Sequence, residues 1–306
     1  MDSRSDEEMA RTRFLPDRGL TSRMVLVMFL LGLLYVAAMA GLIAAGLDWT
    51  LVIIIAAGFL VAQWYFSDKI ALAAMGAREV TPQEAPELHG VIDRLCAMAD
   101  MPKPRVAIAH MDLPNAFATG RNPKNAVVCV TTGLLHRLNG AELQGVLAHE
   151  LSHVAHRDVA VMTIASFLGV LAGLVARFGM YTGLGRSRDN TAVVFAVVWL
   201  ASIVVYVISF LLTRALSRYR EFAADRAGAY LTGEPSALAS ALLKISSDVQ
   251  RIPQRDLRRA QPAQAFFFAP AAVGRSLSGL LSTHPTTEKR IERLAQVSAE
   301  LGKPMV

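Results

Sequence analysis

Cysteine is scarce in this chain, and its scarcity limits what can hold the fold together. The sequence has two cysteines in 306 residues, Cys96 and Cys129, and they do not form a Cys-x-x-Cys pair. A disulfide framework is therefore not expected, and two buried, reduced thiols are the simpler interpretation. Such a chain suits a reducing compartment.

Charge is scarce as well. Asp, Glu, Lys and Arg make up 18% of the residues, whereas ordinary globular chains contain about 25%. Hydrophobic residues make up 53%, and the mean hydropathy is +0.38. The formal net charge is +6, but the basic residues form no long run and no nucleic-acid-binding motif occurs. We infer lipid-facing segments flanked by arginines, and no nucleic-acid partner.

Four apolar runs account for this balance. The first spans residues 24 to about 47 and the second spans 50–66, with only a short link at Asp48 between them. The third and fourth runs, 159–176 and 191–212, are of borderline length. A helix needs about 20 apolar residues to cross a bilayer, so each pair predicts a transmembrane helical hairpin.

The first run has an alternative interpretation as a signal peptide, because Ala38-Met39-Ala40 resembles a small-residue cleavage site. The run continues past that site, and a second apolar run follows at once. The apolar region of a signal peptide is shorter than this. We therefore expect a membrane span.

Basic residues beside the runs predict the orientation. Arginines and lysines precede the first run and follow the second and fourth runs, and the link at Asp48 has none. The second link, with Arg177, Arg186 and Arg188, contradicts this pattern. On balance, the positive-inside rule places both termini and both polar blocks in the cytoplasm.

The chain thus divides into five parts and is predicted to be α+β, mainly α. The parts are a polar tail 1–23, a hairpin 24–66, a polar block 67–158, a hairpin 159–212 and a polar block 213–306. Helical spacing predicts helices over 86–99, 140–158, 216–231, 234–247 and 286–300, and short buried strands are expected at 104–109 and 126–130. Residues 250–282 have weak periodicity and predict a long loop.

The strongest chemical signal is the sequence HELSH. His149 and His153 are four residues apart on a predicted helix, so both imidazoles can reach one metal ion. Asn139 and Glu142 predict a capping box at the start of that helix. Glu150 follows the first histidine, where a carboxylate can take a proton from metal-activated water. Histidines with a purely structural role are the alternative.

A catalytic zinc needs three protein ligands and one open position, and spacing alone leaves the third ligand open. His156 lies one turn beyond His153, but we treat it as a non-ligand. Glu221, in SRYREFAADRAG, is a better candidate, and Asp225 on the same face could accept the free N–H of a ligand histidine. Solvated helix charges paired with nearby arginines are the competing interpretation of both acids.

These motifs resemble the HtpX family of bacterial membrane zinc proteases, which are related to the CAAX prenyl proteases within the gluzincins. The resemblance rests on VLAHELSHVAHRD, SRYREFAAD, NAFATG at 115–120, VTTGLL at 130–135 and STHPTTEKRIERL at 282–294. It covers roughly residues 81–294, although 250–281 matches poorly. It implies a zincin-like catalytic domain with a small mixed or antiparallel sheet, in a multi-pass protein of the bacterial inner membrane.

The resemblance also implies residue roles. His149, His153 and Glu221 would bind one Zn²⁺ per chain, Glu150 would be general base and acid, and Asp225 would contact a ligand histidine.

Further residues receive roles from the resemblance alone. His284 and Arg290 match residues that the family places near the site, where a donor or cation could stabilise an oxyanion. A segment that reads locally as a short strand or turn would be an edge strand to which a substrate backbone adds. This segment comprises Asn115, Ala116, Phe117, Ala118 and Thr119.

The expected function is zinc-dependent endopeptidase activity on misfolded or damaged membrane proteins at the cytoplasmic face. The expected partners are protein or peptide substrates and the lipid bilayer. A zinc-binding adaptor or holdase is the alternative, but Glu150 would be unnecessary in a purely structural site. A site-2 type intramembrane protease would need an LDG motif, which is absent. A transporter or channel would need ionisable residues inside the spans.

Overall fold

The computed structural model describes residues 18–44, 50, 54, 57, 58, 61, 62, 64–156, 190–251 and 285–305. These residues belong to two compact units. The first unit includes residues 67–156, 218–251 and 285–305, and the second includes the described residues of 18–66 and residues 190–217.

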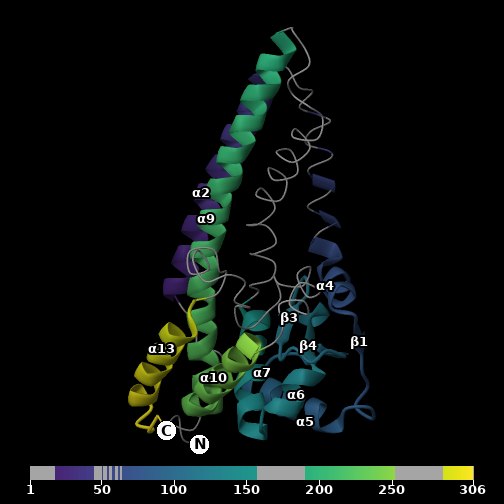
Figure 1. The fold of residues 1–306 in the computed structure, drawn as a ribbon, viewed down its shortest axis with the longest axis vertical. Helices are drawn as coiled ribbons and strands as arrows, with labels where there is room; N and C mark the ends of the chain where they lie inside the picture. Colours follow the sequence, from purple (N-terminus) through teal and green to yellow (C-terminus); the bar gives the residue numbers. More distant parts are fainter. Residues whose placement is uncertain are drawn as a thin grey trace, which may run out of the picture. The chain divides into compact units, whose positions relative to one another are not determined.

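A four-stranded mixed sheet lies within the first unit (Figure 1). Its strands are β1 (Ala77–Glu79), β2 (Arg105–Ala109), β3 (Ala116–Thr119) and β4 (Val127–Thr131), in the spatial order β1-β2-β4-β3. The central strands β2 and β4 run parallel, and both outer strands are antiparallel to their neighbours. The near-continuous apolar runs of β2 and β4 explain their central positions. Both were predicted to within one residue, whereas three-residue β1 was not predicted.

Helices surround the sheet, some in contact with its strands and others packed on those helices. They are α4 (Ser67–Met75), α5 (Pro86–Ala99), α6 (Thr132–Arg137), α7 (Gly140–Ala155), α10 (Pro235–Arg251), α13 (Thr287–Glu300) and the last part of α9 (Asn190–Thr232). The predictions for α5 and α13 are confirmed to within one residue. Helix α7 ends three residues before the predicted boundary and α10 runs four residues further, while α4 and α6 were not predicted. The structure is therefore mainly helical with a small mixed sheet.

Helix α9 corrects one prediction. The sequence suggested an apolar helix over 191–212 and a second helix over 216–231, but the structure has one uninterrupted helix, Asn190–Thr232. The predicted break is wrong because the polar residues after 212 are compatible with a helix, and neither glycine nor proline occurs between 190 and 227. One helix thus begins in the second unit and ends in the first.

The second unit contains the apolar helical segments. Among the described residues, the stretch Trp199–Thr232 of α9 has the length and composition to cross a membrane, and a shorter apolar stretch, Thr21–Leu34, lies in α2 (Arg18–Ala44). The two helices run side by side and pack through Val27, Leu31 and Leu216 (Figure 1). Their other faces expose large apolar side chains, as lipid-facing helices do.

Two of the four predicted membrane runs are described little or not at all. The run 50–66 is described at a few helical positions, and the run 159–176 lies outside the described residues, as do the link 177–189, the tail up to residue 17 and most of the predicted loop 250–282. The four-helix arrangement and the domain boundaries therefore stay predictions.

The first unit has one contiguous apolar core between the sheet and the helices. Ile92 of α5, Leu147 and Leu151 of α7, Leu242 of α10 and Leu294 of α13 are all fully buried in it. Each such side chain contributes about 1.5–3 kcal/mol relative to exposure. This core fixes α7, α10 and α13 against one another.

The start of α7 is fixed by the predicted capping box, which the structure confirms. The Asn139 side chain accepts a hydrogen bond from the Glu142 amide, and the Glu142 carboxylate accepts one from the Asn139 amide, each at 2.9 Å. The same carboxylate also accepts hydrogen bonds from Ser240 at 2.6 Å and Lys244 at 2.8 Å. Glu142 therefore caps the start of α7 and binds this helix to α10.

Replacing this carboxylate should destabilise the fold. We expect Glu142→Ala to lower the free energy of unfolding by about 2 kcal/mol, because several hydrogen bonds to a charged, buried group are lost. Thermal unfolding of the detergent-purified protein measures the effect. Glu234→Ala is the matched control: Glu234 pairs with Lys303 at 2.9 Å, but its side chain is 54% exposed, against 4% for Glu142. An exposed pair should contribute less than about 1 kcal/mol. Equal losses of stability in both variants would therefore contradict the claim that the buried contacts of Glu142 stabilise the fold.

Candidate active site

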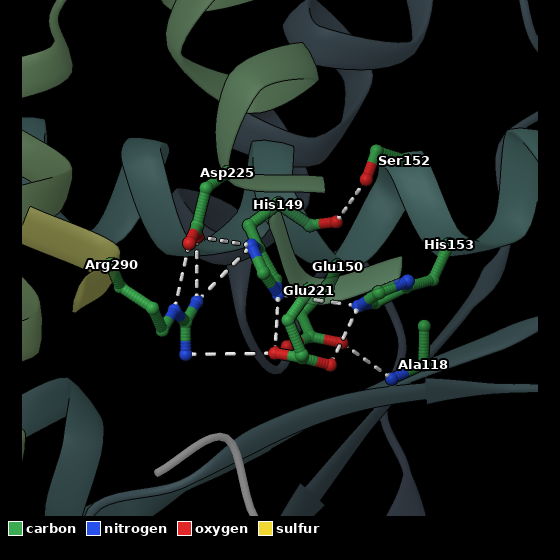
Figure 2. Close-up of polar contacts among 8 residues, drawn as sticks. All are labelled: Ala118, His149, Glu150, Ser152, His153, Glu221, Asp225 and Arg290. Atoms are coloured by element: carbon green, nitrogen blue, oxygen red, sulfur yellow. Dashed lines mark hydrogen bonds and ion pairs between the residues drawn. The ribbon is translucent and has the colours of Figure 1, made fainter. Parts of the chain in front are cut away.

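Two histidines of α7 form the centre of the site. His149 and His153 are one helical turn apart and both are buried. Their Nε2 atoms lie 3.2 Å apart, and the rings meet edge to face (Figure 2). Two imidazole nitrogens this close need a proton or a cation between them.

Glu221 of α9 completes a three-residue cluster. Its Oε2 lies 3.6 Å from His149 Nε2, and its Oε1 lies 3.6 Å from His153 Nε2. One donor atom from each residue lies within 4.8 Å of the others. Ligands of a tetrahedral zinc, at about 2.0–2.1 Å from the ion, lie about 3.3 Å from one another. The cluster therefore has the spacing of three corners of a zinc site.

The charge around the cluster also fits a divalent cation. Glu150, Glu221, Asp225 and Arg290 are all buried. When all three carboxylates are ionised, they exceed the one guanidinium by two negative charges in this group of described residues. Buried charge is costly unless it is balanced, here by protons on His149 or Glu150 or by a divalent cation that replaces them. Two nitrogens and one oxygen form a donor set that suits zinc and leaves one position open.

Asp225 orients the first histidine. Its Oδ1 lies 2.9 Å from His149 Nδ1, and it also accepts a hydrogen bond from Arg290 Nη2 at 2.6 Å. Burial by itself lowers the pKa of His149, but its bonds to Asp225 and Glu221 outweigh burial and raise the pKa to about 9. With this pKa the ring carries a proton on both nitrogens at neutral pH, and a bound cation would replace the Nε2 proton while Nδ1–H stays bonded to Asp225.

Glu150 lies beside the cluster and contacts the sheet. Its Oε2 accepts a hydrogen bond from the Ala118 amide at 2.9 Å (Figure 2). Burial raises the pKa of Glu150 to about 7, and the nearby charge of Glu221 adds to the effect. A carboxyl group with a pKa near neutrality can both accept and return a proton.

Strand β3 lies at the edge of the sheet beside this carboxylate. The Thr131 amide donates to the Asn115 carbonyl at 2.9 Å, so Asn115 is bonded to the next strand. Because bonding alternates along an antiparallel pair, the backbone groups of Ala116 and Ala118 face the outer edge. Outward-facing amide and carbonyl groups can pair with an added strand.

The five predicted substrate-binding residues thus differ in what they offer. All but Ala118 are buried, and Ala118 is half-buried. The backbone of Asn115, Phe117 and Thr119 bonds towards β4. Ala116 and Ala118 offer their backbone to the edge, and Ala118 contacts Glu150.

The other predicted site residues fall into three groups. The cluster of His149, His153 and Glu221 has Glu150, Asp225 and Arg290 around it. His156 ends α7, where its amide donates to the Ser152 carbonyl, and it is not in the cluster. His284 lies outside the described residues.

Gly228 is a functional position that sequence reasoning missed. A Cβ atom placed there would lie 2.9 Å from the His149 backbone nitrogen. The absence of a side chain therefore allows α9 to approach α7 closely enough for Glu221 and Asp225 to reach His149. A glycine within an otherwise strong helical pattern, in DRAGAY, was the available signal.

Comparisons with known proteins point to one family. The sequence model described as Peptidase family M48 matches residues 82–298. The chain is 60% identical over 296 residues to Protease HtpX homolog 1 of Streptomyces coelicolor, covering 96% of this chain and 97% of that protein. It is 53% identical over 289 residues to Protease HtpX homolog of Moorella thermoacetica, covering 93% and 96%.

One solved structure has a similar fold. The crystal structure of S. mikatae Ste24p matches with a TM-score of 0.51 and 18% identity. The match covers 86% of this chain and 62% of that chain, so this chain spans less than two thirds of the solved protein. At this identity the likeness concerns the fold alone.

Adding one methyl group at the contact between the helices should weaken metal binding. We expect Gly228→Ala to displace α9 from α7 and to lower zinc affinity by about 10- to 100-fold, since overpacking of a close contact costs about 1–3 kcal/mol. Zinc competition with a chelator measures the change. Gly90→Ala is the control, because a Cβ at Gly90 meets no atom within 4 Å. Unchanged zinc affinity in Gly228→Ala would show that the close contact of α9 with α7 does not determine the geometry of the metal site.

Proposed function

The chain belongs to peptidase family M48, and within it to the HtpX metalloproteases, and from this premise we propose that His149, His153 and Glu221 bind one Zn²⁺ and that Glu150 is the general base of peptide-bond hydrolysis. The observation that carries the proposal is the buried cluster whose nitrogen and oxygen atoms lie within 4.8 Å of one another. When bound, zinc supplies Lewis acidity, which acidifies water at the site and polarises the scissile carbonyl.

Glu150 provides the proton transfers. It takes a proton from the attacking water and returns it to the leaving amine. A pKa raised to about 7 by burial suits both steps, because the group is readily ionised and readily protonated near neutral pH. The Ala118 amide holds this carboxylate at the edge of the sheet.

Strand β3 provides the binding edge for the substrate. An extended peptide would pair with the outward-facing backbone groups of Ala116 and with the Ala118 carbonyl, because the Ala118 amide donates to Glu150. Recognition through the backbone makes few demands on side chains, but it requires a locally unfolded chain. This favours misfolded or damaged proteins as substrates.

The membrane is part of the proposal. Glu221 lies on the same helix as the apolar run 191–212, and follows that run closely in sequence. We place the catalytic unit and both termini on the cytoplasmic side of the bacterial inner membrane, with 24–66 and 159–212 as two transmembrane hairpins. Most of the flanking basic residues lie in the polar parts outside the hairpins, and the second link, with Arg177, Arg186 and Arg188, is the exception. Membrane proteins with damaged segments near that surface would reach the site.

An adaptor or holdase that binds zinc without cleaving peptides is the competing function. It is not favoured, because the chain belongs to a family of proteases and because a buried carboxylate of raised pKa beside the cluster has no purpose in a purely structural site.

A single substitution separates the two functions. We expect the purified wild type to cleave unfolded casein, to lose activity with a chelator and to regain it with Zn²⁺. Glu150→Gln should bind zinc as the wild type does but lose about 100- to 10,000-fold in kcat/KM, because the proton acceptor is gone. Glu300→Gln, which changes an exposed carboxylate of the same unit, should keep its activity.

The opposite results are equally informative. If wild type and Glu150→Gln both bind zinc and neither cleaves an unfolded protein, the adaptor function replaces the protease function. If Glu150→Gln cleaves normally, another group is the base.

A further inference from the structure

A buried arginine from the C-terminal helix lies against the metal cluster. Arg290 is on α13, 141 residues beyond His149 and 65 beyond Asp225, and it is 1% exposed. Its Nε donates to Asp225 Oδ2 at 2.8 Å and its Nη2 donates to Asp225 Oδ1 at 2.6 Å (Figure 2). This bidentate pair is the geometry in which a guanidinium binds a carboxylate most strongly.

The same guanidinium reaches the other residues of the cluster. Its Nη1 lies 3.5 Å from Glu221 Oε2, and its Nη2 lies 3.4 Å from His149 Nδ1. Arg290 has no acceptor atom, so it and the protonated Nδ1 of His149 both donate to Asp225 Oδ1. Arg290 therefore acts on His149 through Asp225.

We propose that Arg290 is a positioning residue of the metal centre, which holds Asp225 and Glu221 in the places where one orients His149 and the other completes the ligand set. This inference rests on the proposed zinc site. It gives α13 a direct part in assembling a site whose ligands all lie on α7 and α9.

Charge explains why a cation is needed at this point. Glu221 and Asp225 are four residues apart on one helix face, and both are buried. Like charges in this relation repel, and burial makes the repulsion more costly. The guanidinium lies against both carboxylates. Lysine would supply the charge but not the two-pronged contact.

The contacts favour positioning over the oxyanion role expected from the sequence. Nε and Nη2 of Arg290 both donate to Asp225, and Nη1 is directed to Glu221. Figure 2 shows Arg290 on one side of the cluster, while Ala118, on the proposed binding edge, lies on the other side. A donor to the reacting carbonyl would have to lie near that edge.

Other contacts of α13 provide a matched control. Arg226 of α9 pairs with Glu300 of α13 at 3.4 Å, with both side chains about half exposed. This pair joins the same two helices as Arg290 and Asp225 do, but it is half exposed and neither of its residues is a member of the metal cluster. Weakening it tests whether loose docking of α13 alone disturbs the site.

The test compares metal binding in Arg290→Gln, Arg290→Lys and Arg226→Gln in the full-length protein. Zinc affinity is measured by chelator competition, ligand geometry by the visible absorption of the Co²⁺-loaded protein, and folding by circular dichroism. We expect Arg290→Gln to lower zinc affinity by about 10- to 100-fold, the usual effect of losing a group that orients a ligand, and to change the Co²⁺ bands. Arg290→Lys should recover part of the affinity, and Arg226→Gln should match the wild type.

Several results would overturn the inference. Wild-type zinc affinity and Co²⁺ bands in Arg290→Gln, with lost activity, would make Arg290 an oxyanion donor instead. An equal loss of zinc affinity in Arg226→Gln would show that Arg290 acts only by docking α13 in general. If Arg290→Gln does not fold, wild-type affinity in a folded Arg290→Lys would overturn it. If the wild type itself binds no zinc, or if His149→Ala binds zinc normally, the proposed zinc site fails. That result is distinct from the ones above, which concern Arg290 alone.

Discussion

The close approach of two helices is the constraint on which the site depends. Helix α7 carries both histidines and the proposed general base, and α9 carries the two acids that lie against the histidines. The helices can bring these groups within reach because Gly228 leaves room for the His149 backbone. The apolar core fixes α7 from the sheet side, and the capping box fixes where its first turn begins.

Charge is the second requirement, and it links three distant parts of the chain. The buried site collects Glu150 from α7, Glu221 and Asp225 from α9 and Arg290 from α13. When ionised, the three carboxylates outnumber the one guanidinium, which favours a divalent cation beside them. In our proposal, metal binding and the docking of α13 therefore stabilise one another. A single continuous α9 also carries both Glu221, the proposed third ligand, and the apolar run 191–212.

Sequence reasoning succeeded where the information is local. The spacing in HELSH predicted the shared face of His149 and His153, and Asn139 predicted the start of α7 through its capping box with Glu142. Spacing alone left Glu221 undecided, because a ligand and a solvated helix charge have the same local pattern, and only the family resemblance assigned it to the metal. In the structure, packing against α7 places Glu221 beside both histidines. Sequence reasoning missed Gly228 because its role, too, depends on packing against α7. It broke α9 at residue 213 because a change from apolar to polar residues marks a change of solvent and does not end a helix.

The measurement that tests this ligand set most directly is zinc K-edge X-ray absorption on the purified protein and on its Glu221→Ala variant. We predict two imidazole ligands together with oxygen ligands in the wild type, and a changed first shell with weaker binding in the variant. Three imidazoles in the wild type, or a first shell that Glu221→Ala leaves unaltered, would show that α9 does not supply the third ligand.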